Sequence, residues 1–250
     1  MAPTLFISDL HLSPARPPLV AAFHALVSGP ARTAKALYIL GDLFDAWLGD
    51  DQLREAMPAG VARALAQLSE HGVAVYLQCG NRDFLLGERF AQACRGTLLP
   101  EAVVHDVHGT PTLLMHGDML CTDDADYQRF RAYWKDPERR RRLLARPYFV
   151  RRAIAAVLRF GSRRANANKS EAIMDVNAGA VIAAMRQHGV RRMIHGHTHR
   201  PARHEVSIDG QAGERWVLAD WYRAASYLRV DERGVEPHVL DGHERGHPPT

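Results

Sequence analysis

The sequence of 250 residues lacks any long hydrophobic run. No stretch approaches the roughly 20 consecutive apolar residues that a membrane-spanning helix requires. The only cysteines are Cys79, Cys94 and Cys121, which are too few and too irregularly spaced for a disulfide framework or a cysteine zinc site. No basic segment precedes an apolar one near residue 1, so we expect no secretory signal and a cytoplasmic protein.

Lysine is scarce, with three residues against 29 arginines, and the charges are unevenly distributed. Between Arg129 and Arg164 the chain has thirteen basic and two acidic residues. The net charge of this segment is therefore +11. Since the net charge of the whole chain is +4, the rest of the chain has a net charge of −7. The 46% of hydrophobic residues is enough for a sizeable core. We therefore expect an acidic globular body that carries one basic segment.

Five short apolar segments predict β-strands, and each ends in a polar cluster. They are residues 5–8, 37–40, 73–77, 112–115 and 192–194. Helical periodicity appears between them, near residues 17–27, 61–71 and 170–188. This alternation predicts an α/β fold with functional side chains at the carboxyl ends of strands. Four alternating segments, residues 206–208, 216–218, 227–230 and 235–239, predict antiparallel strands that finish a second sheet.

Residues 123–168 fit neither pattern, because they are rich in arginine, alanine and aromatic residues at helical spacing. We interpret them as an inserted helical cap on a core made of residues 1–122 and 169–240, with residues 241–250 as a frayed tail. One helical face of the cap would be apolar and the arginines would fall elsewhere, as in a basic amphipathic helix at a lipid surface. The apolar residues are Val150, Ile154, Val157 and Leu158, and the arginines are Arg151, Arg152 and Arg159.

The polar clusters contain seven residues of types that bind divalent metals: Asp9, His11, Asp42, Asn81, His116, His197 and His199. Mn²⁺, Fe²⁺ and Zn²⁺ accept mixed imidazole and carboxylate ligands, whereas Mg²⁺ prefers oxygen. Four imidazoles therefore argue against an obligate magnesium site. Each short motif alone is equally explained by an ordinary turn. Together they form a ligand inventory for two divalent ions.

In this order, each after an apolar strand, the motifs resemble those of the calcineurin-like metallophosphoesterase superfamily, whose pattern is D-x-H, G-D, G-N-H-D/E, H and G-H-x-H. The resemblance implies an αββα sandwich, with two mixed sheets flanked by helices and a dinuclear site. It also implies that Asp42 bridges the metals. Asp9, His11 and His199 would complete one site, and Asn81, His116 and His197 the other. Two such cations favour hydrolysis of a phosphate ester or anhydride.

The third motif departs from the superfamily pattern, because Arg82 follows Asn81 where histidine is usual. A histidine could protonate a leaving alkoxide, whereas a guanidinium stays protonated and can only clamp anionic oxygens. A phosphate monoester that leaves from a diphosphate does not need that acid. Arg82 therefore favours pyrophosphate cleavage over simple monoester hydrolysis.

Longer motifs resemble the UDP-2,3-diacylglucosamine diphosphatase family of the lipid A pathway in Gram-negative bacteria. They are GDLFDAW (residues 41–47), GNRDFLLG (80–87), HGD (116–118) followed by LCTDD (120–124), AIMDVN (172–177) and HGHTHRP (195–201). The resemblance implies attack of water on the α-phosphorus, which gives UMP and 2,3-diacylglucosamine 1-phosphate, with two Mn²⁺ per chain. The implied catalytic residues are Asp42, Asn81, Arg82 and His116. The implied substrate contacts are Asn81, Arg82, Asp124, Ser162, Asn166, Lys169 and His197.

Several of these residues have simpler explanations. Asp124 could be the N-cap of a helix that starts at Ala125, and Ser162, Asn166 and Lys169 could be solvated loop residues. The cap contains apolar residues that could line a groove for two acyl chains. The same residues could equally pack the cap's own helices against one another. These candidates are Tyr148, Phe149, Ile154, Val157, Leu158 and Phe160.

The expected partners are the glycolipid nucleotide substrate and the anionic cytoplasmic face of the inner membrane, where the basic cap would hold a peripheral, monomeric protein. We expect no nucleic acid partner. One rival is a dinuclear phosphoesterase for another nucleotide-linked or phosphodiester substrate, which would carry histidine at position 82 and no long cap. Another is a non-catalytic nucleic-acid module that uses residues 139–142, Arg151 and Arg152. It would leave the seven metal-type residues without a purpose.

Overall fold

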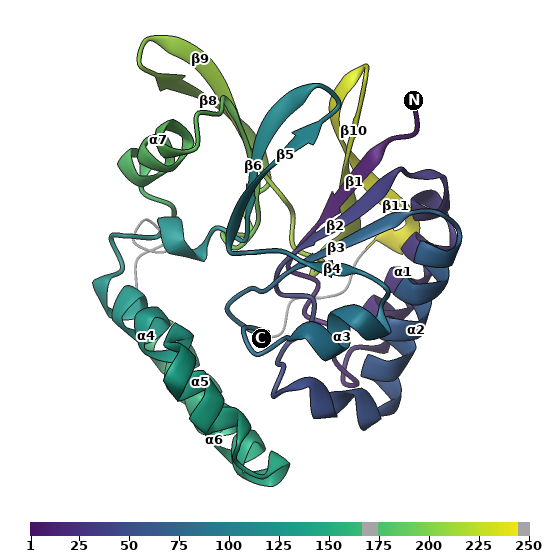
Figure 1. The fold of residues 1–250 in the computed structure, drawn as a ribbon, viewed down its shortest axis with the longest axis vertical. Coiled ribbons are helices and arrows are strands. Elements are labelled where there is room, and N and C mark those ends of the chain that lie inside the picture. Colours follow the sequence, from purple (N-terminus) through teal and green to yellow (C-terminus); the bar gives the residue numbers. More distant parts are fainter. Residues whose placement is uncertain (167–174, 245–250) are drawn as a thin grey trace.

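Two β-sheets pack face to face between helices in the computed structural model, which describes the backbone of residues 1–166 and 175–244 and the side chains of residues 1–157 and 175–240. Helices α1 (Pro17–Ser28), α2 (Ala56–Glu70) and α3 (Glu88–Ala93) cover one outer face, and α7 (Ala178–Gln187) covers the other (Figure 1). This layer order confirms the predicted αββα sandwich.

The first sheet has six strands in the order β11-β10-β1-β2-β3-β4. Strands β1 to β4 are parallel, whereas β10 runs antiparallel to β1 and β11 antiparallel to β10. The sheet is therefore mixed. Its strands are β1 (Thr4–Ile7), β2 (Ala36–Leu40), β3 (Ala74–Gln78), β4 (Thr97–Leu98), β10 (Ala224–Asp231) and β11 (Gly234–Glu244).

The second sheet is also mixed and has the order β5-β6-β7-β9-β8. Strands β6, β7 and β9 are parallel, and antiparallel partners, β5 and β8, close its two edges. The strands are β5 (Ala102–Val107), β6 (Thr110–Met115), β7 (Arg192–His195), β8 (Ala202–Ile208) and β9 (Gln211–Val217).

The sequence suggested that all the C-terminal strands finish the second sheet, and this expectation was wrong. Strands β8 and β9 join it, but β10 and β11 add to the open side of β1 in the first sheet. Backbone pairing also continues past residue 241, where we placed the start of the tail, because Glu244 pairs with Ala224 across a register shift. Each sheet thereby gains an antiparallel edge.

Central strands are buried on both faces, which explains their uninterrupted apolar sequences. In β1, Leu5 and Ile7 pack with the outer helices, while Phe6 packs between the sheets. A third cluster lies between the second sheet and α7 and includes Met193 of β7 and Met185 of the helix. Both sheets are therefore packed on each face, and the loops that follow their strands start from buried positions.

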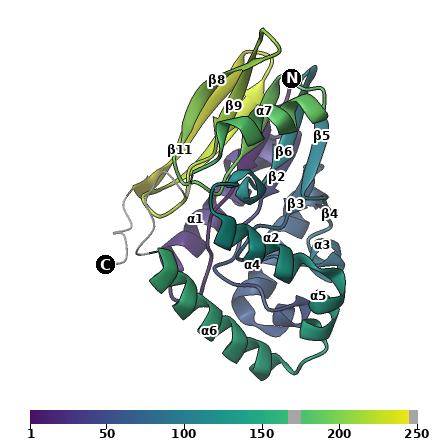
Figure 2. The same cartoon turned by 90° about the vertical axis from the view of Figure 1, so that its left-hand side faces the viewer.

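Among the described residues, three short 3₁₀ helices lie in the connections: η1 (Pro30–Thr33), η2 (Asp50–Arg54) and η3 (Asp118–Leu120). After η3 the chain leaves the core and forms an insert of three helices: α4 (Ala125–Lys135), α5 (Pro137–Leu144) and α6 (Tyr148–Asn166). The insert forms an elongated arm away from the sheets (Figures 1 and 2). In the described parts of the chain, no helix combines the length and hydrophobicity needed to cross a bilayer.

Ion pairs join the basic insert to acidic residues of the core. Arg131 Nε lies 2.7 Å from Asp118 Oδ2, and Arg131 Nη2 lies 2.7 Å from Glu101 Oε2. Arg151, expected on a polar face of α6, is instead buried at 5% exposure and pairs with Asp51. Part of the positive charge of the insert is therefore used in docking it to the acidic body.

The helix predicted over residues 170–188 begins later than expected. Asn177 caps α7 by accepting a hydrogen bond from the Ala180 N–H at 3.0 Å, so Asp175 and Val176 precede the helix. Residues 170–174 lie outside the described residues. Asn177 has the extended backbone that is typical of an N-cap residue.

Candidate metal centre

Five of the seven candidate metal ligands have a left-handed backbone. The φ angles are 56° at Asp9, 48° at His11, 53° at Asp42, 69° at His197 and 55° at His199. Non-glycine residues rarely adopt this region, and such strain concentrates at functional sites. The tight turns directly follow strand ends and point these side chains across the carboxyl edge of the sheets.

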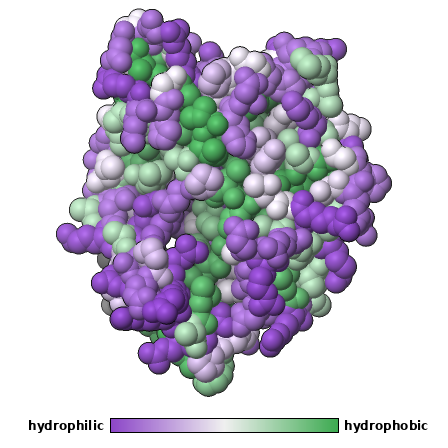
Figure 3. Space-filling view, viewed as in Figure 1, coloured by the Kyte–Doolittle hydropathy of each residue, from purple (hydrophilic) through white to green (hydrophobic). Residues whose placement is uncertain are grey.

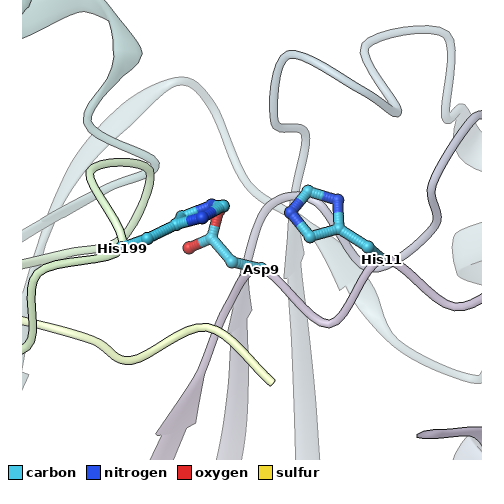
Figure 4. A group of neighbouring side chains, drawn as sticks. All are labelled: Asp9, His11 and His199. Atoms are coloured by element: carbon cyan, nitrogen blue, oxygen red, sulfur yellow. The ribbon is translucent and has the colours of Figure 1, made fainter. Parts of the chain in front are cut away.

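Asp9, His11 and His199 form the first ligand cluster (Figure 4). One ligand atom from each lies within 4.8 Å of the others, and His199 Nε2 is 3.2 Å from Asp9 Oδ1. Asp9 and His11 follow β1, whereas His199 comes from the loop after β7. The i, i+2 spacing predicted for Asp9 and His11 therefore places them in one cluster with a residue from the second sheet.

Asn81, His116 and His197 form a second cluster beside the first. Asn81 Oδ1 lies 3.0 Å from both His116 Nε2 and His197 Nδ1. The other nitrogen of His116, Nδ1, is 2.9 Å from the Leu40 carbonyl oxygen, which fixes the ring and leaves Nε2 facing the cluster.

Asp42 lies between the two clusters. Its Oδ2 is 3.9 Å from His11 Nε2, and its Oδ1 is 3.8 Å from His116 Nε2. The carboxylate is 2% exposed and accepts a hydrogen bond from the Arg82 N–H at 2.7 Å. A single carboxylate therefore presents one oxygen to each cluster.

These residues fit a pair of divalent cations. Neither ring nitrogen of His11 has a hydrogen-bond partner among the described residues, although both are buried. An unpartnered buried imidazole is costly unless something else occupies its lone pair. Mixed imidazole, carboxylate and amide ligands suit a borderline metal such as Mn²⁺.

The protonation of the site also suits metal binding. Burial lowers the pKa of His11 to about 3 and that of His197 to about 4, so both rings are neutral at pH 7. Burial raises the pKa of Asp42 to about 7. Burial opposes protonation of His116, but the carboxylates of Asp42 and Asp9 raise its pKa to about 9. Without metal, Asp42 and His116 therefore hold protons that a cation must displace.

We expect Mn²⁺ to release protons when it binds to the metal-free protein, and its affinity to rise between about pH 6 and pH 9. The sign follows because only the deprotonated forms of Asp42 and His116 bind metal, and their raised pKa values place both deprotonations in this range. Calorimetric titration in buffers of different ionisation enthalpy measures the released protons. A pH-independent affinity with no proton release would contradict the assignment of these ligands.

Comparison with known proteins agrees with this geometry. The sequence pattern of the calcineurin-like phosphoesterase family matches residues 2–201. The chain belongs to the calcineurin-like phosphoesterases. Within that family, it is 51% identical over 233 residues to a UDP-2,3-diacylglucosamine hydrolase of Salmonella arizonae, which covers 93% of this chain and 97% of the relative. A protein of the same name from Aromatoleum aromaticum is 50% identical, with 92% and 94% covered.

The family assignment makes the chain a hydrolase with a divalent metal centre, and the fold and the family expected from its motifs are confirmed. Only some of the side chains expected to contact substrate lie among the described residues. Arg82 lies beside Asn81 at the site, and the Asp124 carboxylate caps α4 by accepting from the Tyr127 N–H at 3.0 Å. Ser162 and Asn166 belong to α6, but their side chains, like all of Lys169, lie outside the described residues.

Sequence reasoning missed Asp83, which organises two ligand loops. Its side chain is fully buried, and Oδ1 accepts hydrogen bonds from the N–H groups of Gly80 at 2.7 Å and Asp42 at 3.2 Å. Oδ2 accepts from the Leu43 N–H at 2.8 Å. Its only signal in the sequence was its place in the GNRD motif.

Tyr127 and Asp118 were also missed. The Tyr127 hydroxyl donates to Asp118 Oδ2 at 3.1 Å, and its ring lies 5.9 Å from that of His197. Burial lowers the tendency of Asp118 to ionise, but the charges of His116, Lys135 and Arg131 hold its pKa below the usual range. This buried carboxylate therefore connects helix α4 of the insert to the second ligand cluster.

Proposed function

We propose that the protein hydrolyses the pyrophosphate bond of UDP-2,3-diacylglucosamine by attack of water on the α-phosphorus, which gives UMP and 2,3-diacylglucosamine 1-phosphate. The observation that carries the proposal is the position of Asp42 between two clusters of metal-type ligands. The identity of about 50% to hydrolases named for this substrate supports the choice of substrate.

Two Mn²⁺ ions would be held by Asp9, His11, His199 and Asp42 on one side, and by Asn81, His116, His197 and Asp42 on the other. When bound, such a pair lowers the pKa of a water molecule and withdraws charge from the phosphoryl oxygens. Asp42, Asn81, Arg82 and His116 are the proposed catalytic residues.

Arg82 suits a diphosphate substrate. Its backbone N–H is fixed on Asp42, which anchors the residue beside the ligand clusters. The guanidinium remains protonated and can hold two phosphoryl oxygens, but it cannot donate a proton to a poor leaving group. A sugar 1-phosphate leaves as an anion of low basicity, so no general acid is needed at this position.

The insert offers apolar surface for acyl chains. Figure 3 shows a band of hydrophobic residues beside the hydrophilic helices of the insert. Phe149 is 73% exposed and Val157 is 71% exposed, whereas the Tyr148 hydroxyl donates to Glu55 of the core and Ile154 packs against the core. We propose that the insert, residues 123–168, is the cap that holds the two chains, with Asp124, Ser162, Asn166 and Lys169 near the sugar and Asn81, Arg82 and His197 near the diphosphate.

The basic surface of the insert supports peripheral binding of a monomer to the cytoplasmic face of the inner membrane. Arg129, Arg141, Arg142 and Arg152 remain exposed. Each basic group near an anionic surface contributes on the order of 1 kcal/mol, which salt screens. We therefore expect the protein to co-sediment with anionic vesicles at low salt and to be released by about 1 M NaCl. Retention at that salt would contradict an electrostatic attachment.

A direct assay tests the reaction. The protein with Mn²⁺ is incubated in ¹⁸O-labelled water with UDP-2,3-diacylglucosamine or with bis-p-nitrophenyl phosphate. We expect turnover of the glycolipid, with ¹⁸O in UMP. Turnover of the plain phosphodiester alone would favour the rival phosphoesterase, and label in the sugar phosphate would place the attack on the other phosphorus.

A further inference from the structure

Residues 220–222 lie in the connection between β9 and β10, beyond residue 201 where the family match ends. The motifs that led to the metal centre do not include them. In the structure, however, these three consecutive residues touch all three members of the first ligand cluster, and the Tyr222 ring lies near both His11 and His199.

Asp220 and Trp221 make the first two contacts. Asp220 Oδ2 lies 3.2 Å from His199 Nδ1, the ring nitrogen opposite the one that faces Asp9. The Trp221 N–H donates to the Asp9 carbonyl oxygen at 3.3 Å. Trp221 itself is 1% exposed, and its indole N–H donates to the Ser226 carbonyl oxygen at 2.9 Å. A deeply buried anchor thus holds the segment against the ligands.

Tyr222 makes the third contact by stacking on His11. The ring centroids are 5.3 Å apart and the planes are 11° from parallel. Arg16 Cζ lies 4.6 Å from the centroid of the same tyrosine ring. Tyr222 is oriented in turn by its own segment, because its N–H donates to Asp220 Oδ1 at 3.0 Å. The phenol ring is therefore fixed from several directions.

Metal-binding histidines normally use their second ring nitrogen for a hydrogen bond that sets the orientation of the ring. His199 has such a bond to Asp220, and His116 has one to the Leu40 carbonyl. His11 differs, since within the described chain neither of its nitrogens has a hydrogen-bond partner. Ring contacts can hold its plane instead: the Tyr222 ring stacks on it nearly in parallel, and the ring of His199, itself a ligand, lies tilted at 5.4 Å.

We propose that residues 220–222 are a positioning segment for the first metal site, in which the Tyr222 ring substitutes for the missing hydrogen bond of His11 and the Asp220 carboxylate orients His199. The inference rests on the metal ligands of the proposed function and assigns roles to residues outside the motifs. It makes Tyr222 and Asp220 positioning residues that act through His11 and His199.

The test measures metal binding rather than turnover. Metal-free protein is titrated with Mn²⁺, and free Mn²⁺ is followed by electron paramagnetic resonance. We expect two bound ions in the wild type, and a Tyr222→Leu variant that binds one of them about 10- to 100-fold more weakly while the other is unchanged. Tyr222→Phe keeps the ring and should bind both ions as the wild type does.

Tyr227→Leu is the matched control. Tyr227 stacks on His238 with a centroid distance of 5.2 Å and an interplanar angle of 7°, which closely reproduces the Tyr222 geometry away from the ligands. Unchanged binding of both ions in Tyr222→Leu would overturn the proposal, as would a Tyr222→Phe variant as weak as Tyr222→Leu. Fewer than two ions in the wild type would instead contradict the proposed metal site.

Asp220→Asn is a second test of the positioning segment, and it leaves the stacked Tyr222 ring in place. It preserves the shape of the side chain but removes the charge opposite His199 Nδ1. We expect it to weaken the same single ion as Tyr222→Leu, with a melting temperature close to that of the wild type. This variant decides the question if Tyr222→Leu does not fold, and full affinity for both ions would overturn the role of the segment.

Discussion

Replacing Asp42 with alanine is expected to lower hydrolysis of the diphosphate by about 10³-fold or more, because both metal sites lose a ligand together. Each carboxylate oxygen faces a different cluster, at 3.9 Å from His11 Nε2 and 3.8 Å from His116 Nε2. Metal analysis of the purified variant should show that both ions are depleted. Steady-state kinetics with the glycolipid measures the loss.

Asp42→Asn separates chemistry from folding. The backbone φ of Asp42 is 53°, a region that asparagine tolerates better than alanine does. The amide also keeps an acceptor for the Arg82 N–H. We expect the Asp42→Asn variant to fold normally and still lose both ions. Asp126→Ala, which removes an exposed carboxylate of the insert, should change neither the folding nor the metal content. Retention of two tightly bound ions by the Asn variant would refute a bridging role.

Replacing Arg82 with alanine is expected to reduce kcat/KM by about 10²-fold while both metal ions stay bound. The side chain is proposed to hold phosphoryl oxygens, whereas only the backbone N–H of the residue supports Asp42. Alanine keeps that N–H, so the ligand clusters should persist. Kinetics and metal content must be measured on the same preparation.

Arg89→Ala is a suitable control for Arg82, because Arg89 is exposed on the neighbouring helix α3 and its backbone N–H, which bonds to Asp50, is preserved. It should behave as the wild type. Arg82→Lys keeps the charge but loses the planar fork, and should recover only part of the activity. Loss of metal from Arg82→Ala in proportion to its activity would show that the residue supports the metal centre instead of the substrate.

The fold class and the gathering of the seven metal-type residues could be predicted because both depend on local signals. Each apolar strand ends in a short polar motif, and parallel strands bring their carboxyl ends to one edge. Asp9 and His199 are 190 positions apart, yet they meet because β1 and β7 belong to sheets that pack face to face. The motifs alone carried this information.

Contacts that depend on long-range packing could not be predicted. Nothing local marks Asp83 as the acceptor for two separate loops, or Tyr222 as the ring against His11. The alternating pattern of residues 227–230 identified a strand, but it did not indicate that this strand pairs with β1 in the first sheet. Strand pairing is set by the partner edge as much as by the strand's own sequence.

The charge asymmetry can be read from the sequence, but the contacts of the individual arginines cannot. The excess of arginine suggested a surface for anionic lipid, but Arg131 and Arg151 bind the acidic residues Asp118 and Asp51 of the core. A balance of charges along the sequence does not distinguish a basic surface from one side of an internal interface. The exposed arginines that remain are those proposed to meet the membrane.

The most direct test of the two-metal account is a crystal structure of the Mn²⁺-loaded protein with an anomalous difference map recorded at the manganese edge. The account predicts two peaks on either side of the Asp42 carboxylate, one against Asp9, His11 and His199 and the other against Asn81, His116 and His197. A single peak, or two peaks that do not share Asp42, would contradict it.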